Sequence, residues 1–283
     1  MANTSVKTAN SRWQKPRSEN EALHVKDLMD AKHPSIYPDE PATKARALIR
    51  DINLRILPVI DGEKRLLGKV SRRDVLTISS SVSPIQVRGI MTPARHVATM
   101  EDDITTTVKA MLRVDVWCSP VVTSEEDKTY RGVLGLERYI QTVVETSPEK
   151  FVKDVSEIMT KKVVTCSPDD EVERIWRLMR DKRLAGLPVV KDDKLVGIVT
   201  VKDLLQRGAV SPGFESGKGR FRSSPKVAFV MKTGIVAVEP TVKAIRVAKV
   251  MVERDVGRVP VKDKQDRLLG IVDREDIVRL TVK

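Results

Sequence analysis

Residues 195–205 read LVGIVTVKDLL, and related phrases occur three more times in the chain. Residues 66–76 read LLGKVSRRDVL, residues 268–278 read LLGIVDREDIV, and a more divergent copy starts at Gly132 as GVLGLER. Each phrase has a glycine beside apolar residues and then a run that is typical of a helix. The repetition predicts that the chain is built from four copies of one supersecondary unit.

Two further phrases repeat in step with the first. An apolar phrase that ends in methionine occurs at VKDLM (25–29), VRGIM (87–91), VSEIM (155–159) and VAFVM (227–231). An apolar phrase that contains proline occurs at LPVI (57–60), SPVV (119–122), LPVV (187–190) and VPVK (259–262). Every methionine precedes its proline by 29 residues, as Met29 precedes Pro58. Because the spacing is the same four times, we treat the repeat as established.

The order of the phrases predicts the architecture of one unit. We expect a short strand after the methionine, such as VVTC at 163–166, and then an amphipathic helix. On that helix Val172, Ile175, Trp176 and Met179 share one face. The proline phrase and the glycine phrase predict two more strands, and a last helix follows. A β-α-β-β-α unit of about 60 residues has little core of its own, so we expect the units to pair.

The order of methionine phrase, LPVV and GIVTxxD resembles the cystathionine-beta-synthase (CBS) domain, and the four copies cover nearly all of residues 23–283. In that family two CBS domains pack into a Bateman module. The resemblance therefore implies an α/β fold of four CBS repeats in two modules, a layout shared by archaeal four-CBS proteins and the gamma subunit of AMP-activated protein kinase. The expected divisions are a basic tail at 1–22, repeats at 23–80, 84–145, 150–208 and 225–283, and a basic insert at 209–224.

Two explanations fit Thr200 and Asp203, which lie at a predicted strand-to-helix junction. They are spaced as a capping box, which is worth about 1 kcal/mol. Alternatively, the helix start and the hydroxyl favour a phosphate, while the carboxylate accepts hydrogen bonds from the two hydroxyls of a ribose. The resemblance implies the second assignment, with adenine held between backbone segments and AMP, ADP or ATP as the regulatory ligand.

The first and third repeats keep both groups, because Ser71 and Asp74 match Thr200 and Asp203. Near the proline phrases, Arg55 and Arg258 are placed either to contact phosphates across a module or to lie on the solvated surface.

The other two repeats are altered. The fourth keeps Asp276 but has Asp273 in place of the hydroxyl, so it can hold a ribose and should disfavour a phosphate. The second has Gly135 and Arg138, so we predict no adenosine site from its own motif. Arg138 can instead face the phosphates of a ligand bound by the first repeat.

The basic charge is concentrated in two segments. Residues 1–18 and 206–226 carry +4 each of the formal net charge of +12. Cations interleaved with aromatic rings suit irregular RNA, whose phosphates they neutralise and whose bases they stack on. The candidate RNA-binding residues are Arg12, Trp13, Lys15, Arg17, Lys218, Arg220, Phe221, Arg222 and Lys226. A disordered tail and a solvated linker are the alternative.

The sequence assembles no catalytic set and no spacing of metal ligands, and Cys118 and Cys166 are expected to be buried, inert thiols. With no apolar run of membrane-spanning or signal-peptide length, we expect a cytoplasmic protein, which can form a homodimer. We predict a non-enzyme that senses adenine nucleotides and binds RNA or the ribosome, as a hibernation factor that inhibits translation in resting cells. The alternative is a nucleotide-binding regulatory subunit that acts on a protein partner such as a kinase or transporter.

Overall fold

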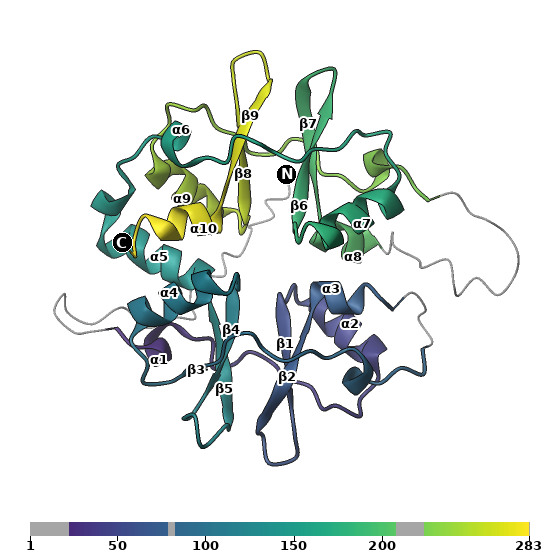
Figure 1. Cartoon of the computed structure of the whole chain (residues 1–283), viewed down its shortest axis with the longest axis vertical. Coiled ribbons are helices and arrows are strands. Elements are labelled where there is room, and N and C mark those ends of the chain that lie inside the picture. Colours follow the sequence, from purple (N-terminus) through teal and green to yellow (C-terminus); the bar gives the residue numbers. More distant parts are fainter. Residues whose placement is uncertain (1–22, 79–82, 208–223, 283) are drawn as a thin grey trace, which may run out of the picture.

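The structure is a computed structural model that describes residues 23–78, 83–207 and 224–282. Its elements fall into four consecutive units, each with a short helical turn, a longer helix, an antiparallel pair of strands and a closing helix (Figure 1). The α-β-β-α part of the predicted repeat is therefore present in all four positions.

The first unit comprises α1 (Val25–Leu28), α2 (Ala42–Asp51), β1 (Ile56–Ile60), β2 (Leu66–Ser71) and α3 (Arg72–Val75). The second comprises η1 (Val87–Gly89), β3 (Ala98–Thr99), α4 (Ile104–Arg113), β4 (Cys118–Val122), β5 (Tyr130–Gly135) and α5 (Leu136–Thr146). The third comprises η2 (Pro148–Phe151), α6 (Val155–Ile158), α7 (Val172–Asp181), β6 (Gly186–Lys191), β7 (Lys194–Thr200) and α8 (Val201–Arg207). The fourth comprises η3 (Val227–Phe229), α9 (Ala244–Glu253), β8 (Arg258–Lys262), β9 (Leu268–Asp273) and α10 (Arg274–Arg279).

The longer helix of each unit forms where the apolar spacing predicts it. On α7 the predicted face is buried, with Val172, Ile175 and Met179 at most 1% exposed and Trp176 at 8%. Apolar residues three and four positions apart lie on one side of a helix, so burying this face anchors the helix to its strands.

The strand predicted after each methionine is shorter than expected. Only the second unit forms a strand there, β3, and the stretch 163–166 contributes a single parallel bridge from Cys166 to Val189. The segment contacts two different strands, because Thr160 pairs with Ile271 of the fourth unit and Cys166 pairs with Val189 of its own unit. Each contact is a single residue pair, so no continuous ladder forms.

Reciprocal backbone hydrogen bonds join the units in pairs. Lys69 and Thr92 exchange two bonds of 2.9 Å, and Ile198 and Lys232 exchange bonds of 3.0 and 2.8 Å. The repeated glycine makes this approach possible, because a Cβ on Gly197 would lie 2.6 Å from the Lys232 carbonyl oxygen. The first two units therefore form one module and the last two form the other.

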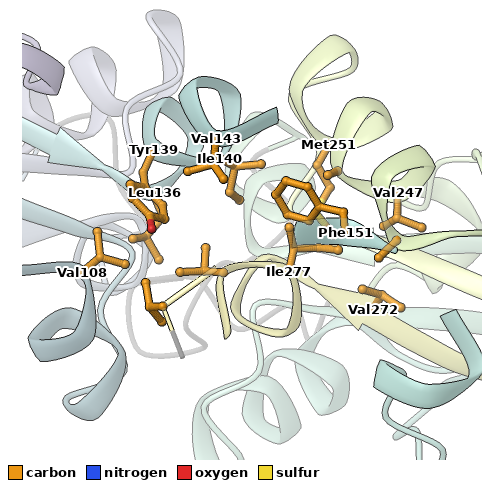
Figure 2. Packing of buried hydrophobic residues seen from close by; sticks show 14 of the residues in the cluster. Val108, Leu136, Tyr139, Ile140, Val143, Phe151, Val247, Met251, Val272 and Ile277 are labelled. Atoms are coloured by element: carbon orange, nitrogen blue, oxygen red, sulfur yellow. The ribbon is translucent and has the colours of Figure 1, made fainter. Parts of the chain in front are cut away.

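The two modules share their hydrophobic cores. One cluster joins the second and fourth units, where residues of α5 such as Ile140 pack with Phe151, Met251 and Ile277 (Figure 2). The other cluster joins the first and third units, where Ile49 of α2 lies in one core with α7 and α8. Figure 1 shows the result, two halves facing each other with their helices packed across the junction. Because buried apolar area is the main source of stability, the modules are expected to unfold together.

Candidate functional site

Four equivalent positions follow the glycine phrases, and we name them by unit. Site A contains Ser71 and Asp74, site B contains Gly135 and Arg138, site C contains Thr200 and Asp203, and site D contains Asp273 and Asp276. In each case the strand ends at the first residue and a helix begins with the next one. The segment that crosses each strand comes from the other unit of the same module.

In site A the carboxylate of Asp74 is held through one oxygen. The backbone N–H and the hydroxyl of Ser71 both donate to Asp74 Oδ2 at 2.7 Å, and Lys69 Nζ approaches the same oxygen at 3.4 Å. Among the described residues, no hydrogen bond or ion pair reaches Asp74 Oδ1. That oxygen is therefore available to a ligand.

In site C the carboxylate is more deeply buried. Asp203 is 2% exposed, and its Oδ2 accepts hydrogen bonds from the backbone N–H of Thr200, at 2.9 Å, and from the Thr200 hydroxyl. Lys232 Nζ lies 3.0 Å from Oδ1 in an ion pair, but no hydrogen bond from the described residues reaches that oxygen. The exposed ammonium group is thus the contact that a ligand hydroxyl would replace at this oxygen, which marks it as a candidate ligand contact.

The capping box is also present, so capping and ligand binding share these residues. The backbone N–H of Asp203 donates to Thr200 Oγ1 at 3.2 Å, which completes the reciprocal pair. The same bonds recur away from the sites, because Thr99 N and Oγ1 donate to Asp102 at 2.7 and 2.6 Å. A Thr-x-x-Asp pattern alone therefore does not indicate a ligand.

The expected source of phosphate affinity needs a correction. Helices α3, α8 and α10 have only 4, 7 and 6 residues, so few aligned peptide dipoles contribute at their starts. The hydroxyls of Ser71 and Thr200 donate to carboxylates rather than toward an open space. Any preference for phosphate at these sites must come from neighbouring cationic side chains.

Site D differs because two carboxylates meet. Asp276 Oδ2 accepts a hydrogen bond from the backbone N–H of Asp273 at 2.9 Å, as in the intact sites. Burial, together with the negative charge of Asp273, raises the pKa of Asp276 to about 7. No cationic side chain among the described residues forms an ion pair with Asp276. The carboxyl group of Asp276 is thus expected to change its protonation near neutrality.

Site B opens into a pocket of about 210 Å³. Its lining includes Asp30, His33, Arg55, Glu137 and Arg138, a mixture of acids and bases in place of a ribose-binding carboxylate. Neither Ser71 nor Asp74 lines this pocket. The prediction that Arg138 faces a ligand of the first repeat therefore remains a prediction.

A larger cavity of about 370 Å³ lies beside the outer half of β2, the strand that ends at Ser71. It is lined by Leu67 and Gly68 of that strand and by Pro93, Ala94 and Val97 of the segment that follows Met91. Thr99, Glu125 and Lys128 also line it, so its walls are partly apolar and partly polar, and its size lies in the range of roughly 300–1,000 Å³ that is usual for small-molecule pockets.

A polar cluster occupies the junction between the modules, and it includes both arginines predicted near the proline phrases. Arg55 lies 3.4 Å from Asp255 and 3.7 Å from Glu137, and Arg258 lies 5.1 Å from the centre of the Trp117 ring. Neither arginine is exposed, so the solvated-surface alternative is wrong for both.

Two further arginines complete what we call the arginine cluster: Arg55, Arg72, Arg258 and Arg274. Arg274 is 1% exposed and pairs with Glu137 and Asp255 at 3.3 and 3.1 Å. Burial, together with the positive charge of Arg55, lowers the pKa of Arg72 to about 10. Four arginines against two close carboxylates leave an excess of positive charge at the centre of the molecule.

Several of these residues were not predicted from the sequence, although differences between equivalent positions of the four repeats indicate them. Arg72 and Arg274 each follow the first residue of a site, where the other two units have Leu136 and Val201. Comparing the four repeats position by position also separates Lys69 from its apolar counterparts, and Lys232 from Asp30, Thr92 and Thr160.

The predicted RNA-binding residues lie outside the described residues, except for Lys226. Lys226 is exposed and lies 4.0 Å from Glu171. Burial raises the pKa of both Cys118 and Cys166 to about 12, so the thiols stay protonated, as expected of inert cysteines. Within residues 23–78, 83–207 and 224–282, no cluster of three metal-ligating side chains occurs and no helix is long and apolar enough to cross a membrane.

Known proteins resemble the chain over most of its length. Protein MJ1225 of Methanocaldococcus jannaschii is 23% identical over 276 residues, which cover 90% of this chain and 97% of that protein. Its crystal structure, described as that of a proposed archaeal homologue of γ-AMPK, has a TM-score of 0.81 over 92% of this chain and 100% of that one, at 20% identity. This likeness shows the fold.

Two other relatives are longer than the chain. Uncharacterized protein MJ1404 of the same organism is 29% identical over 90% of this chain, which spans 61% of that protein. An inosine-5'-monophosphate dehydrogenase, also from that organism, is 33% identical over 45% of this chain, which spans 23% of the enzyme. A model of the CBS domain matches residues 25–81, 155–209 and 227–283. Because these matches cover more than half of its residues, the chain belongs to the CBS domain family.

Proposed function

We propose that the chain is a non-catalytic sensor of adenine nucleotides, and that AMP, ADP or ATP binds at sites A and C. The observation that carries the proposal is the second carboxylate oxygen of each site aspartate, which the residue three positions earlier does not hold. In site A no hydrogen bond or ion pair from the described residues reaches Asp74 Oδ1, and in site C the exposed Lys232 alone lies against Asp203 Oδ1. Two adjacent ribose hydroxyls are donors that suit such an oxygen.

The surroundings of site A support the other parts of a nucleotide. The cavity beside β2 is proposed to receive adenine, since its walls include Leu67 and Gly68 of the strand that carries Ser71, although Ser71 and Asp74 do not line it. Arg72 directly follows Ser71 and belongs to the arginine cluster, whose excess positive charge suits phosphates. Arg55 and Arg258 are proposed to take part in the same contact.

The output of the sensor is proposed from different observations. The relative described as a γ-AMPK homologue favours a regulatory subunit that acts on a protein partner such as a kinase. The basic segments at 1–18 and 206–226 favour RNA or a ribosome, as in a hibernation factor, and this second candidate rests on the sequence alone.

Thermal unfolding with added ligand tests the nucleotide proposal. A ligand that binds only the folded protein raises the Tm in a concentration-dependent way. We expect such a rise with at least one of AMP, ADP and ATP. If these three and S-adenosylmethionine all leave the Tm unchanged, the proposal fails and capping alone explains the motif.

Sedimentation of the protein with ribosomal subunits at two salt concentrations separates the two outputs. An RNA partner predicts binding that weakens steeply with salt, because each phosphate contact releases counterions. Removal of residues 1–18 should then abolish sedimentation. Capture of one protein with little salt dependence, and no sedimentation with ribosomes, would support the regulatory subunit.

A further inference from the structure

Sites A and C, the two intact sites, each contain one lysine. In both sites the lysine belongs to the pair of residues that joins the strand to the crossing segment, but it lies on a different member of that pair. In site A the pair is Lys69 with Thr92, so the lysine lies on the strand that leads to Ser71. In site C the pair is Ile198 with Lys232, so the lysine comes from the crossing segment of the other unit. The corresponding pairs at sites B and D, Val133 with Asp30 and Ile271 with Thr160, have no lysine.

This exchange changes which carboxylate oxygen the ammonium group covers. Lys69 approaches Asp74 Oδ2, the oxygen already held by Ser71, and leaves Oδ1 open. Lys232 lies against Asp203 Oδ1, the oxygen that Thr200 does not hold. A ligand can therefore reach the free oxygen of site A directly, whereas in site C it meets Lys232.

The burial of the two lysine–aspartate ion pairs also indicates that site A is more accessible than site C. The Asp74 side chain is 20% exposed, while the Asp203 side chain is 3% exposed behind a lysine that is itself 55% exposed. Because Lys232 is largely exposed, it can swing into solvent without unpacking the core. An ion pair with one exposed partner is weak enough to exchange for a stronger anion.

We propose that Lys232 gates site C, so that site C admits nucleosides that carry a phosphate and disfavours the uncharged nucleoside, whereas site A admits both. The phosphate draws the ammonium group away from Asp203 Oδ1, and the ribose hydroxyls then take its place. Lys202 on α8 adds positive charge nearby, and burial, which lowers its pKa, shows that it is partly withdrawn from water. This gate rests on the proposed nucleotide function and assigns a selectivity within it.

Calorimetry with adenosine and with AMP tests the gate at site C alone. The background is Asp74→Ala with Asp276→Ala, which removes the carboxylates of sites A and D. In this background we expect AMP to bind and adenosine to bind much more weakly. Lys232→Thr should tighten adenosine by roughly fivefold and weaken AMP by a similar factor, because a half-exposed ion pair is lost.

Lys232→Thr is expected to fold, because threonine occupies the equivalent positions 92 and 160. Lys191→Met is the matched control. It changes an exposed lysine on β6, in the third unit, which also contains site C, and it should change neither affinity. In the Asp203→Ala with Asp276→Ala background, which leaves site A, Lys69→Ile with Thr92→Lys copies the arrangement of site C. This pair should weaken adenosine at site A.

The outcomes separate the gate from the function on which it rests. If AMP does not bind the wild-type protein, the nucleotide proposal fails and the gate fails with it. If AMP binds but Lys232→Thr leaves adenosine unchanged or weaker, the gate is wrong and the nucleotide site stands.

Discussion

Asp203 and Asp276 occupy the same position in two units of one module, yet their surroundings are opposite. Each accepts a hydrogen bond of 2.9 Å from the backbone N–H three residues earlier. Asp203 then meets a hydroxyl and a lysine, whereas Asp276 meets the second carboxylate of Asp273. The repeat therefore fixes where a carboxylate is placed, and the neighbouring residues decide its charge and the ligand that it suits.

The largest expected effect follows from removing each carboxylate in turn. Asp203→Ala should weaken AMP at site C by roughly 10- to 100-fold, because a hydrogen bond to a charged group is worth about 1.5–3 kcal/mol. Asp276→Ala should change AMP binding little, since site D disfavours phosphate. Calorimetry of both variants measures the difference.

Asp102→Ala is the matched control for this pair of variants. It removes the same pair of hydrogen bonds, from a threonine backbone N–H and hydroxyl to a carboxylate three residues later, but lies in the other module, away from site C. If Asp102→Ala weakened AMP at site C as much as Asp203→Ala does, loss of stability rather than loss of a ligand contact would explain both results.

The next effect concerns stability and pH. The folded-state pKa of Asp276 is about 7, above its ordinary value of 3.8, so between these values the folded protein keeps a proton that the unfolded chain has lost. This group therefore makes stability fall as pH rises from about 4 to about 7, and the loss is complete above pH 7. Asp276→Asn should raise the free energy of unfolding at pH 8 by on the order of 2 kcal/mol, discounted for partial exposure, with no gain at pH 4.

Denaturant unfolding at several pH values checks this expectation. An equal gain at pH 4 and pH 8 would show that the benefit of asparagine does not come from the charge of Asp276. The equivalent substitution Asp203→Asn should show no gain at pH 8, because Asp203 has a lysine beside it.

The smallest effect comes from converting site D toward site C. Asp273→Thr restores the hydroxyl and removes the like charge, so it should lower the pKa of Asp276 and improve AMP binding at site D by roughly fivefold. Calorimetry in the Asp74→Ala with Asp203→Ala background measures site D alone. Unchanged binding there would indicate that residues beyond this pair distinguish the two sites.

The sequence predicted the repeated fold because its apolar spacing and glycine phrases are local signals. The helix at 172–181 and the strands around Pro188 follow directly from those patterns. The stretch 163–166 did not form a strand, because only Cys166 pairs with the neighbouring strand of its own unit, and the apolar pattern does not show how many residues will pair.

The candidate sites were predicted only in part, because some of their contacts come from other units of the chain. Ser71, Asp74, Thr200 and Asp203 are close in sequence to their own partners and could be found. Lys232 reaches Asp203 from the next unit, and Arg274 reaches Glu137 of the other module across 137 residues. Such contacts depend on how the units pack, which the spacing within one repeat does not encode.

The stoichiometry of AMP binding tests most directly the proposal that nucleotides bind at sites A and C. It is measured by titration calorimetry on the wild-type chain and on the double variant Asp74→Ala with Asp203→Ala. We expect two molecules of AMP to bind per wild-type chain and none to bind the double variant. The double variant should still unfold cooperatively. Binding that persists in the folded double variant, or a wild-type chain that binds no AMP, would contradict the proposal.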